Sequence, residues 1–221
     1  MPRLRSTTEI AEFRDRLCEA ATRLFAQHGA DGFTMRMLAA EVGCATMTSY
    51  RYFKDKDELL AAVRARAFDR FSQALEAAAQ TPGDSRAKSA AIGEAYVAFA
   101  LANREAYQLM FEMSPPDTER FPDLARAGAR ASGTMTGYVR AMIDEGALKG
   151  DPVMIGRMFW AAIHGVVQLE LNGVLPPGPG ADTLRREMMR ALFIGLNTDR
   201  PRGGRARAAP SPARAQADVK G

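Results

Sequence analysis

The sequence predicts an all-α protein of about nine helices. Apolar residues recur every three or four positions through most of residues 9–199, which is the period of one helix face. No segment shows the sustained apolar–polar alternation of a half-buried strand. Helix-capping residues precede several of the periodic segments, and Gly or Pro follows them. Because 47% of the 221 residues are apolar, the chain can bury a substantial core.

Three of these helices are expected within residues 9–53. The apolar face of the first consists of six residues: Ile10, Phe13, Leu17, Ala21, Leu24 and His28. Gly29 should stop this helix, and Thr34 can cap a short second helix that Gly43 ends. A third short helix is expected over residues 45–52. Two short helices joined by a tight turn form a helix-turn-helix, whose second helix lies in the major groove of DNA.

A long helix is expected next, because Asp55 lies three residues before Glu58, which is the spacing of a capping box. Its buried face should consist of Leu60, Val63, Ala67, Phe71, Ala74 and Ala78. The sequence TPGD at 81–84 breaks the pattern. One later helix is expected to carry Ile92, Tyr96, Phe99 and Asn103 on one face. Others are expected at about 105–112, 124–145, 152–172 and 184–196, with Asp151 as the cap of the helix at 152–172. We place a domain boundary near residues 70–82, which divides 9–70 from 71–199.

The basic charge is concentrated in the C-terminal tail. The net charge is +4, yet residues 200–221 contain six Lys or Arg residues against Asp218 alone. The tail is rich in Pro, Gly, Ala and Arg, so it is predicted to be disordered. Residues 1–199 are close to neutral. Overall charge is therefore weak evidence for nucleic-acid binding, and the case depends on a local site.

Several other classes of protein are disfavoured. No apolar run approaches the ~20 residues of a membrane span, and the N-terminus lacks a signal-peptide core, so a cytoplasmic protein is expected. Cys18 and Cys44 are too few for a disulfide framework and are expected to be reduced. The sequence has no metal-spaced His/Cys cluster, no phosphate loop and no Ser/His/Asp arrangement. We therefore expect neither an enzyme nor a cofactor.

The segment GCATMTSYRYFKDKDEL, residues 43–59, carries the candidate DNA contacts. Its hydroxyl groups include those of Thr46, Thr48, Tyr50 and Tyr52. The threonines can meet base edges, and the tyrosines can reach phosphate oxygens. Arg51 can pair with phosphate or guanine, and Lys56 lies at a helix start that already favours phosphate. Phe53 is the expected apolar anchor. Taken singly, each tyrosine could instead be a core residue, and Arg51 could simply be solvated.

At these positions the chain resembles the TetR family of DNA-binding regulators over about residues 9–63. The matching residues are Phe25, Ala26, Gly29, Thr34, Leu38, Ala39, Gly43, Thr48, Tyr50, Tyr52, Phe53 and Lys56. The resemblance implies that Thr34 contacts phosphate, that Arg36 contacts a base or phosphate, and that Ala45 and Met47 lie on the recognition helix.

The chain departs from the family pattern at three places. Cys44-Ala45 replaces Val-Ser, Met47 replaces Gly or Ala, and Ser49 replaces a large apolar residue. Ser49 should weaken the packing of the recognition helix. Met47 could press on a thymine methyl or cover the gap that Ser49 leaves. These changes should alter which DNA sequence is recognised, and the role of Cys44 stays open.

The C-terminal part offers candidates for a ligand pocket. Aromatic, Met and polar residues on its expected helices include Phe99, Tyr107, Met110, Phe111, Met135, Tyr138, Met142, Trp160, His164 and Gln168. Flexible Met and aromatic side chains suit an apolar cavity, although each one singly is also typical of a core. Residues 159–173 resemble the Trp-His-Gly type of TetR C-terminal domain, and Gly165 should permit close helix approach.

The resemblance implies a helical effector-binding and dimerisation domain. The last two helices, about 152–172 and 183–197, would form a four-helix bundle with a partner chain. A homodimer implies an approximately palindromic operator on double-stranded DNA, from which a small-molecule effector would release a repressor. The alternatives are a helical small-molecule binding protein that has lost its DNA role, and a regulator that needs no effector.

Overall fold

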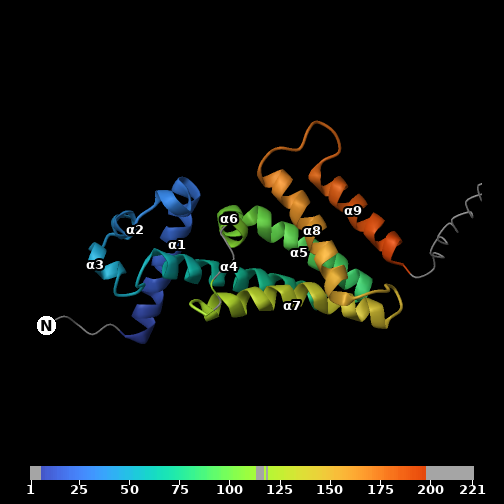
Figure 1. The fold of residues 1–221 in the computed structure, drawn as a ribbon, viewed down its shortest axis with the longest axis horizontal. Helices are drawn as coiled ribbons and strands as arrows, with labels where there is room; N and C mark the ends of the chain where they lie inside the picture. Colours follow the sequence, from blue (N-terminus) through green and yellow to red (C-terminus); the bar gives the residue numbers. More distant parts are fainter. Residues whose placement is uncertain (1–5, 113–116, 118, 198–221) are drawn as a thin grey trace, which may run out of the picture.

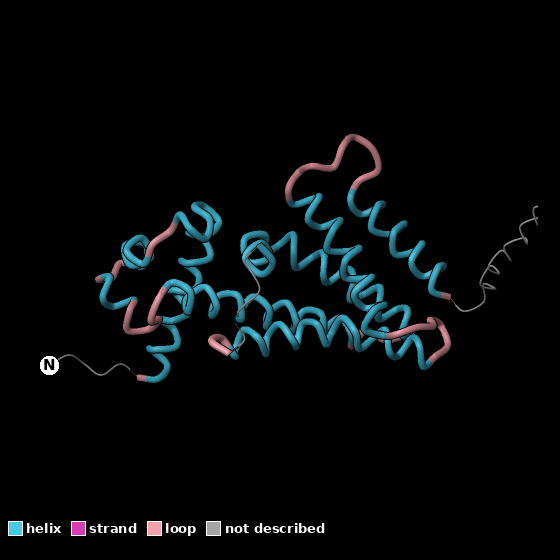
Figure 2. The backbone as a smooth tube through the Cα atoms, viewed as in Figure 1, coloured by secondary structure: helices cyan, strands magenta, loops and turns pink. Residues whose placement is uncertain are grey.

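The protein is described here by a computed structural model that covers residues 6–112, 117 and 119–197 (Figure 1). These residues form nine α-helices and no strand, which confirms the predicted fold class (Figure 2). The helices are α1 Thr7–Gly32, α2 Met35–Val42, α3 Thr46–Ser49, α4 Lys56–Ala79, α5 Ser85–Ala102, α6 Arg104–Glu112, α7 Pro122–Asp144, α8 Pro152–Leu171 and α9 Ala181–Leu196. The predicted basic tail, residues 200–221, lies outside the described residues.

Side-chain caps set the starts of most helices. The side chains of five N-cap residues accept a backbone N–H from three residues further on: Ser6, Thr34, Asp55, Asp84 and Asp151. The caps predicted at Thr34, Asp55 and Asp151 are thereby confirmed. Glu58 closes the start of α4 from the other side, since its carboxylate accepts from the backbone N–H of Lys54 at 2.6 Å.

Glycines interrupt or end helices at the two predicted positions. Gly43 follows α2 with φ 74° and ψ 41°, a left-handed conformation. Gly29 breaks α1 with φ 69° and ψ 177°, and three further helical residues follow it. The predicted apolar stripe of α1 was too long, because Ile10 is 42% exposed and His28 is also exposed.

The recognition segment is shorter than predicted. Helix α3 ends at Ser49, whereas the sequence indicated an end near Tyr52. The carbonyl of Ser49 accepts from the N–H groups of both Tyr52 and Phe53, at 3.0 and 3.1 Å, so the chain tightens into a turn. This turn directs Phe53 into the core. Helices α7 and α9 begin two and three residues earlier than predicted, at Pro122 and Ala181.

Helix α4 belongs to two hydrophobic cores. We call α1–α3 with the first turns of α4 the head, and the later turns of α4 with α5–α9 the body. The first turns of α4 pack with α1, α2 and Phe53 in the core of the head, and its later turns contribute Ala67, Phe71 and Leu75 to the core of the body. Helix α7 lies alongside α4 over most of its length (Figure 1). The predicted boundary between residues 70 and 71 therefore falls within a continuous helix.

One residue of the body enters the head. Leu109 on α6 is fully buried within the head core, although its neighbours Tyr107 and Met110 belong to the body core. The guanidinium of Arg64 on α4 donates to the carbonyl of Met110 at 3.3 Å. Helix α6 is thus packed on both units at once.

The two ends of the molecule differ in their exposed residues. Helices α1–α3 form one end, and α8 and α9 lie side by side at the other, joined by the loop at 172–180 (Figure 1). Six apolar side chains on α8 and α9 are more than a third exposed: Val153, Met154, Met158, Trp160, Leu169 and Ile194. None of the helices in the described ranges has the length and apolarity needed to cross a membrane.

Candidate nucleic-acid interface and ligand cavity

Two buried residues hold the recognition segment on the head. Ser49 and Phe53 are 0% and 1% exposed, and the guanidinium of Arg14 lies over the Phe53 ring at 4.3 Å. The Ser49 hydroxyl donates to the carbonyl of Thr46 at 2.7 Å, so this polar group is satisfied within its own turn. Ser49 is thus fully buried although it is smaller than the apolar residue that the resemblance leads one to expect at this position.

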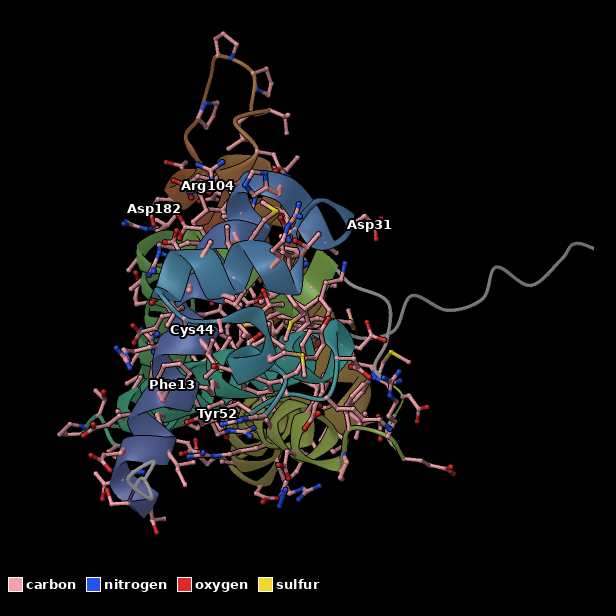
Figure 3. The ribbon with its side chains drawn as sticks, turned by 90° about the vertical axis from the view of Figure 1, so that its left-hand side faces the viewer. Phe13, Asp31, Cys44, Tyr52, Arg104 and Asp182 are labelled. Atoms are coloured by element: carbon pink, nitrogen blue, oxygen red, sulfur yellow. The ribbon has the colours of Figure 1, made fainter. Side chains whose placement is uncertain are left out.

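The opposite face of the segment is exposed. Met47 is 72% exposed, so it does not cover Ser49, and Tyr50 is 44% exposed. Ala45 and Arg51 are also exposed, whereas Thr46 and Thr48 are half-buried. Figure 3 views this end of the molecule face-on, with Cys44 at the connection between α2 and α3. The surface presents short hydroxyl groups beside one methionine, one phenol and one guanidinium.

The start of α2 adds two groups from the neighbouring helix. The Thr34 hydroxyl accepts the backbone N–H of Met37 at 3.2 Å, and Thr34 itself is exposed. Arg36 projects from the first turn and is exposed. Because α2 packs against α3, the free N–H groups at the start of α2 belong to the same end of the molecule.

Two predicted contact residues also hold the scaffold together. The Tyr52 ring lies 4.8 Å from that of Phe13 (Figure 3), and the Tyr52 carbonyl accepts from Arg14 at 2.7 Å. The Lys56 ammonium donates to the carbonyl of Ala30 at 2.7 Å and approaches that of Phe33 at 3.5 Å. Lys56 therefore ties α4 to the last turn of α1 and to Phe33 after it, a use that helix periodicity does not reveal.

The body contains a mainly apolar cavity of ≈ 280 Å³ bounded by α4, α6, α7 and α8. Three of the predicted ligand residues line it: Phe111, Met135 and Trp160. The rest of the lining consists of Phe68, Phe71, Gly128, Ala131, Ser132, Thr136, Val153, Gly156 and Arg157. A volume near 300 Å³ is at the small end of ligand sites.

The other predicted ligand residues lie elsewhere. Tyr107, Met110 and Met142 are fully buried core residues, and Phe99 is buried against Phe71. Tyr138 lines a neighbouring cavity, which Met135 also lines. Of the ten predicted residues, the structure thus brings three together at the apolar cavity.

His164 and Gln168 belong to a polar cluster with Tyr96 and Tyr107. The Tyr107 hydroxyl lies 2.6 Å from Nδ1 of His164 and 2.8 Å from the Tyr96 hydroxyl. Gln168 approaches the other ring nitrogen at 3.5 Å. Burial lowers the pKa of His164, and burial raises the pKa of Tyr96 to about 12. A half-buried histidine whose two ring nitrogens both have partners in this way is typical of a structural residue.

Small residues create the cavity, and sequence reasoning missed them. The segment RAGARASGTMTG in α7 supplies Gly128, Ala131 and Ser132, and α8 supplies Gly156. A Cβ at Gly156 would lie 2.9 Å from Thr136 Cγ2, so the close approach of α7 and α8 occurs there. Gly165, where the sequence predicted it, has no atom within 4 Å of such a Cβ. A run of small residues in a long amphipathic helix was the available signal.

Comparisons with known proteins match both parts of the chain. The family model described as "Bacterial regulatory proteins, tetR family" matches residues 17–63. The model described as "Tetracyclin repressor-like, C-terminal domain" matches residues 89–192. An uncharacterized HTH-type transcriptional regulator of Mycobacterium tuberculosis is 26% identical over 197 residues, which cover 87% of this chain and 85% of that protein.

One further relative and two solved structures also resemble this chain. The HTH-type transcriptional repressor DrrR1 of Streptomyces coeruleorubidus is 35% identical over 102 residues, which cover 46% of this chain and 36% of that protein. A solved structure of a protein with unknown function from Rhodococcus sp. RHA1 superposes with a TM-score of 0.74 at 28% identity, covering 90% of this chain and 100% of that one. The TetR family transcriptional regulator PfmR from Thermus thermophilus shares the fold, with a TM-score of 0.63 at 20% identity over 84% of this chain and 100% of that one.

Proposed function

Because the chain belongs to the TetR family of bacterial transcriptional regulators, which bind DNA and small effectors as dimers, we propose that it is a cytoplasmic dimeric repressor. In this proposal a small, mainly apolar ligand releases it from a palindromic operator. Residues 9–70 bind DNA, and residues 71–199 bind the effector and the partner chain. The observation that carries the proposal is the exposed face of α3, held in place by the buried Ser49 and Phe53.

The DNA contacts divide by chemistry. Thr46, Met47 and Thr48 meet base edges, because short hydroxyls and a thioether fit the major groove and the thymine methyl. Tyr50 and Arg51 grip phosphates at the rim. The start of α2, with Thr34 and Arg36, takes a phosphate through its N–H groups and its cation. Ala45 adds only apolar contact. Tyr52 and Lys56 mainly hold the recognition segment in position. The Tyr52 hydroxyl and the Lys56 ammonium also lie at the DNA-binding end of the molecule.

The exposed apolar residues of α8 and α9 are the proposed dimer interface. Val153, Met154 and Met158 on α8 and Ile194 on α9 give these helices a surface that a partner can bury. Two copies paired there place their heads apart at the far ends of the molecules. An operator with half-sites one or more helical turns apart, ~34–36 Å per turn, fits such a dimer.

The effector acts through α6 in this proposal. Phe111 lines the apolar cavity, and Leu109 two residues earlier is buried in the head core. A ligand that displaces Phe111 must move α6, and Leu109 carries that movement into the head. Only the difference in ligand affinity between the two head arrangements drives release. A coupling of about 1–3 kcal/mol, common in allostery, would change operator occupancy substantially.

The test is selection of bound duplexes from a randomised pool by the full-length protein, followed by fluorescence anisotropy. We expect an approximately palindromic sequence to emerge. The Arg51→Gln variant should reduce the slope of log K against log salt by about one, as expected for one lost phosphate contact. The Thr48→Ala variant should weaken the free energy of binding to the selected duplex by about 1–3 kcal/mol and reduce the sequence preference at one base pair.

Arg140→Gln provides the matched control, because Arg140 is exposed on α7 in the body. It should leave both affinity and salt slope unchanged. If the pool yields no sequence preference at moderate salt, the repressor proposal is wrong, and the alternative of a small-molecule binding protein without a DNA role takes its place.

A further inference from the structure

A second cavity, of ≈ 350 Å³, lies between α5, α7, α8 and α9. Its floor is apolar and includes Ile163, Tyr138, Phe159 and Phe193. Met135 lines both this cavity and the apolar one, so its side chain separates the two. We call this second space the arginine-rimmed cavity, because Arg86, Arg185, Arg186 and Arg190 line it. The proposed repressor function makes no use of it.

The charges of the rim are unbalanced. Four guanidinium groups face one lining carboxylate, that of Glu94. Two further carboxylates stand outside the lining: Asp182 pairs with Arg185 and Arg186, and Glu187 lies 3.9 Å from Arg190. The net charge of this group of side chains remains positive. Arg86 forms no ion pair with any described residue, and its guanidinium lies 5.7 Å from the Phe193 ring. The positive charge of Arg86 thus lies next to the apolar side chain of Phe193 in the cavity wall.

Arg185 gives independent evidence of an incomplete site. Its side chain is only 8% exposed, and one terminal nitrogen donates to Glu94 at 2.6 Å and to Asp182 at 2.7 Å. Its Nε is buried and has no hydrogen-bond partner among the described residues. Buried donors normally find an acceptor, because leaving one unpaired is unfavourable. The Arg185 guanidinium is therefore an incompletely satisfied donor in the wall of this cavity.

We propose that the arginine-rimmed cavity binds a monocarboxylate with an apolar body. The head group would accept from the arginines of the rim, and the body would lie on the aromatic and aliphatic floor. At ~30 Å³ per water-sized volume, the cavity holds about a dozen such units. This size suits a body of roughly eight carbons. The ligand differs from that of the apolar cavity, whose lining has Arg157 as its single charged residue.

The experiment is isothermal titration of the full-length protein with octanoate at low ionic strength, without DNA. Octanol serves as the analogue that has the apolar chain but no charge, and acetate as the carboxylate that lacks the long apolar chain. Octanoate should bind at least about tenfold more tightly than either, because both parts of the site contribute. Added salt should weaken octanoate binding and leave octanol binding nearly unchanged.

Variants assign the binding to this cavity. Arg86→Gln and Arg190→Gln alter exposed side chains, so they should fold, and each should weaken octanoate roughly two- to fivefold. Arg140→Gln, outside both cavities, should have no effect. Gly93→Leu should abolish binding, because a Cβ at Gly93 has room, lying 3.9 Å from Arg185 and Ile163, while the longer side chain enters the cavity.

Several results would overturn the proposal. They are equal affinities for octanoate and octanol, unchanged binding in both arginine variants, or loss of octanoate binding when the apolar cavity is filled by Gly128→Leu. The measurement involves no duplex, so its failure leaves the repressor proposal untouched. Failure of the repressor proposal would likewise not affect the titration.

Discussion

Filling the apolar cavity from Gly128 should stabilise the protein and remove its response to ligand. Gly128 lies within α7, lines the cavity, and has no atom within 4 Å of a Cβ placed on it. The Gly128→Leu side chain therefore enters existing space. A removed leucine side chain leaves a cavity on the order of 150 Å³. The added leucine would thus occupy about half of the ≈ 280 Å³ available.

The stability gain has two sources. Replacing glycine within a helix contributes about 0.5–1 kcal/mol, since the unfolded chain loses freedom. Burying the leucine side chain contributes up to ~1.5–3 kcal/mol, and less where the cavity stays open to solvent. A total near 2 kcal/mol corresponds to a rise in Tm of about 4–8 °C for a chain of this size.

Gly133→Leu is the matched control. Gly133 is on the same helix, also has open space around it, and does not line the cavity. It is exposed, so only the helix contribution of about 0.5–1 kcal/mol remains. The two variants therefore differ by the buried leucine alone.

The assay uses the single tryptophan of the chain, Trp160, which lines the cavity. Its emission is titrated with toluene as a small apolar probe, and Tm is measured by calorimetry. We expect toluene to change the emission of the parent and of Gly133→Leu, and not that of Gly128→Leu. If both variants respond to toluene alike and melt at the same temperature, the cavity is not where the probe binds.

Three further predictions concern the core and its turns. Burial lowers the pKa of His164 below 6.5, so the unfolded chain binds more protons just below that pH. Stability should therefore fall as pH drops from 6.5 and level off beneath the lowered pKa; His164→Gln should flatten this slope in melting curves from pH 5 to 8, and equal slopes would contradict it. Gly29→Ala should cost more than Gly43→Ala in urea unfolding, about 1–3 against about 1–2 kcal/mol, because ψ 177° at φ 69° excludes other residues more strongly than the left-handed region does; the reverse order would refute this. Leu109→Ala should lower the free energy of unfolding by about 2–5 kcal/mol, because it leaves a void in the head core. Amide hydrogen exchange should show reduced protection in α1 as well as in α6. Protection lost from α6 alone would count against a shared core.

Local signals in the sequence predicted most of the fold. Thr34, Asp55 and Asp151 bond to backbone N–H groups of their own helices, so their roles depend on neighbours within four residues. Gly43 likewise adopts the conformation that a left-handed turn requires. Such interactions are encoded in short stretches, and reasoning from residue type and spacing finds them.

Tertiary contacts were beyond that reasoning. Nothing in the periodicity of α6 indicates that Leu109 faces the head while Met110 faces the body. The Lys56 ammonium is used by carbonyls more than twenty residues earlier. The cavity arises where small residues of two helices meet, and the large residues chosen as ligand contacts, such as Met142, fill space instead. The position of an empty cavity depends on how the helices pack together, which residue type and spacing do not specify.

The continuity of α4 has a mechanical consequence. Its 24 residues rise ~1.5 Å each, which makes a stiff rod about 36 Å long. Tilting such a rod by about 5° at its body end would swing its tip by ~3 Å, the length of one hydrogen bond. The protein therefore has a lever arm built into its backbone, and sub-ångström adjustments near one end can become base-pair-scale displacements at the other.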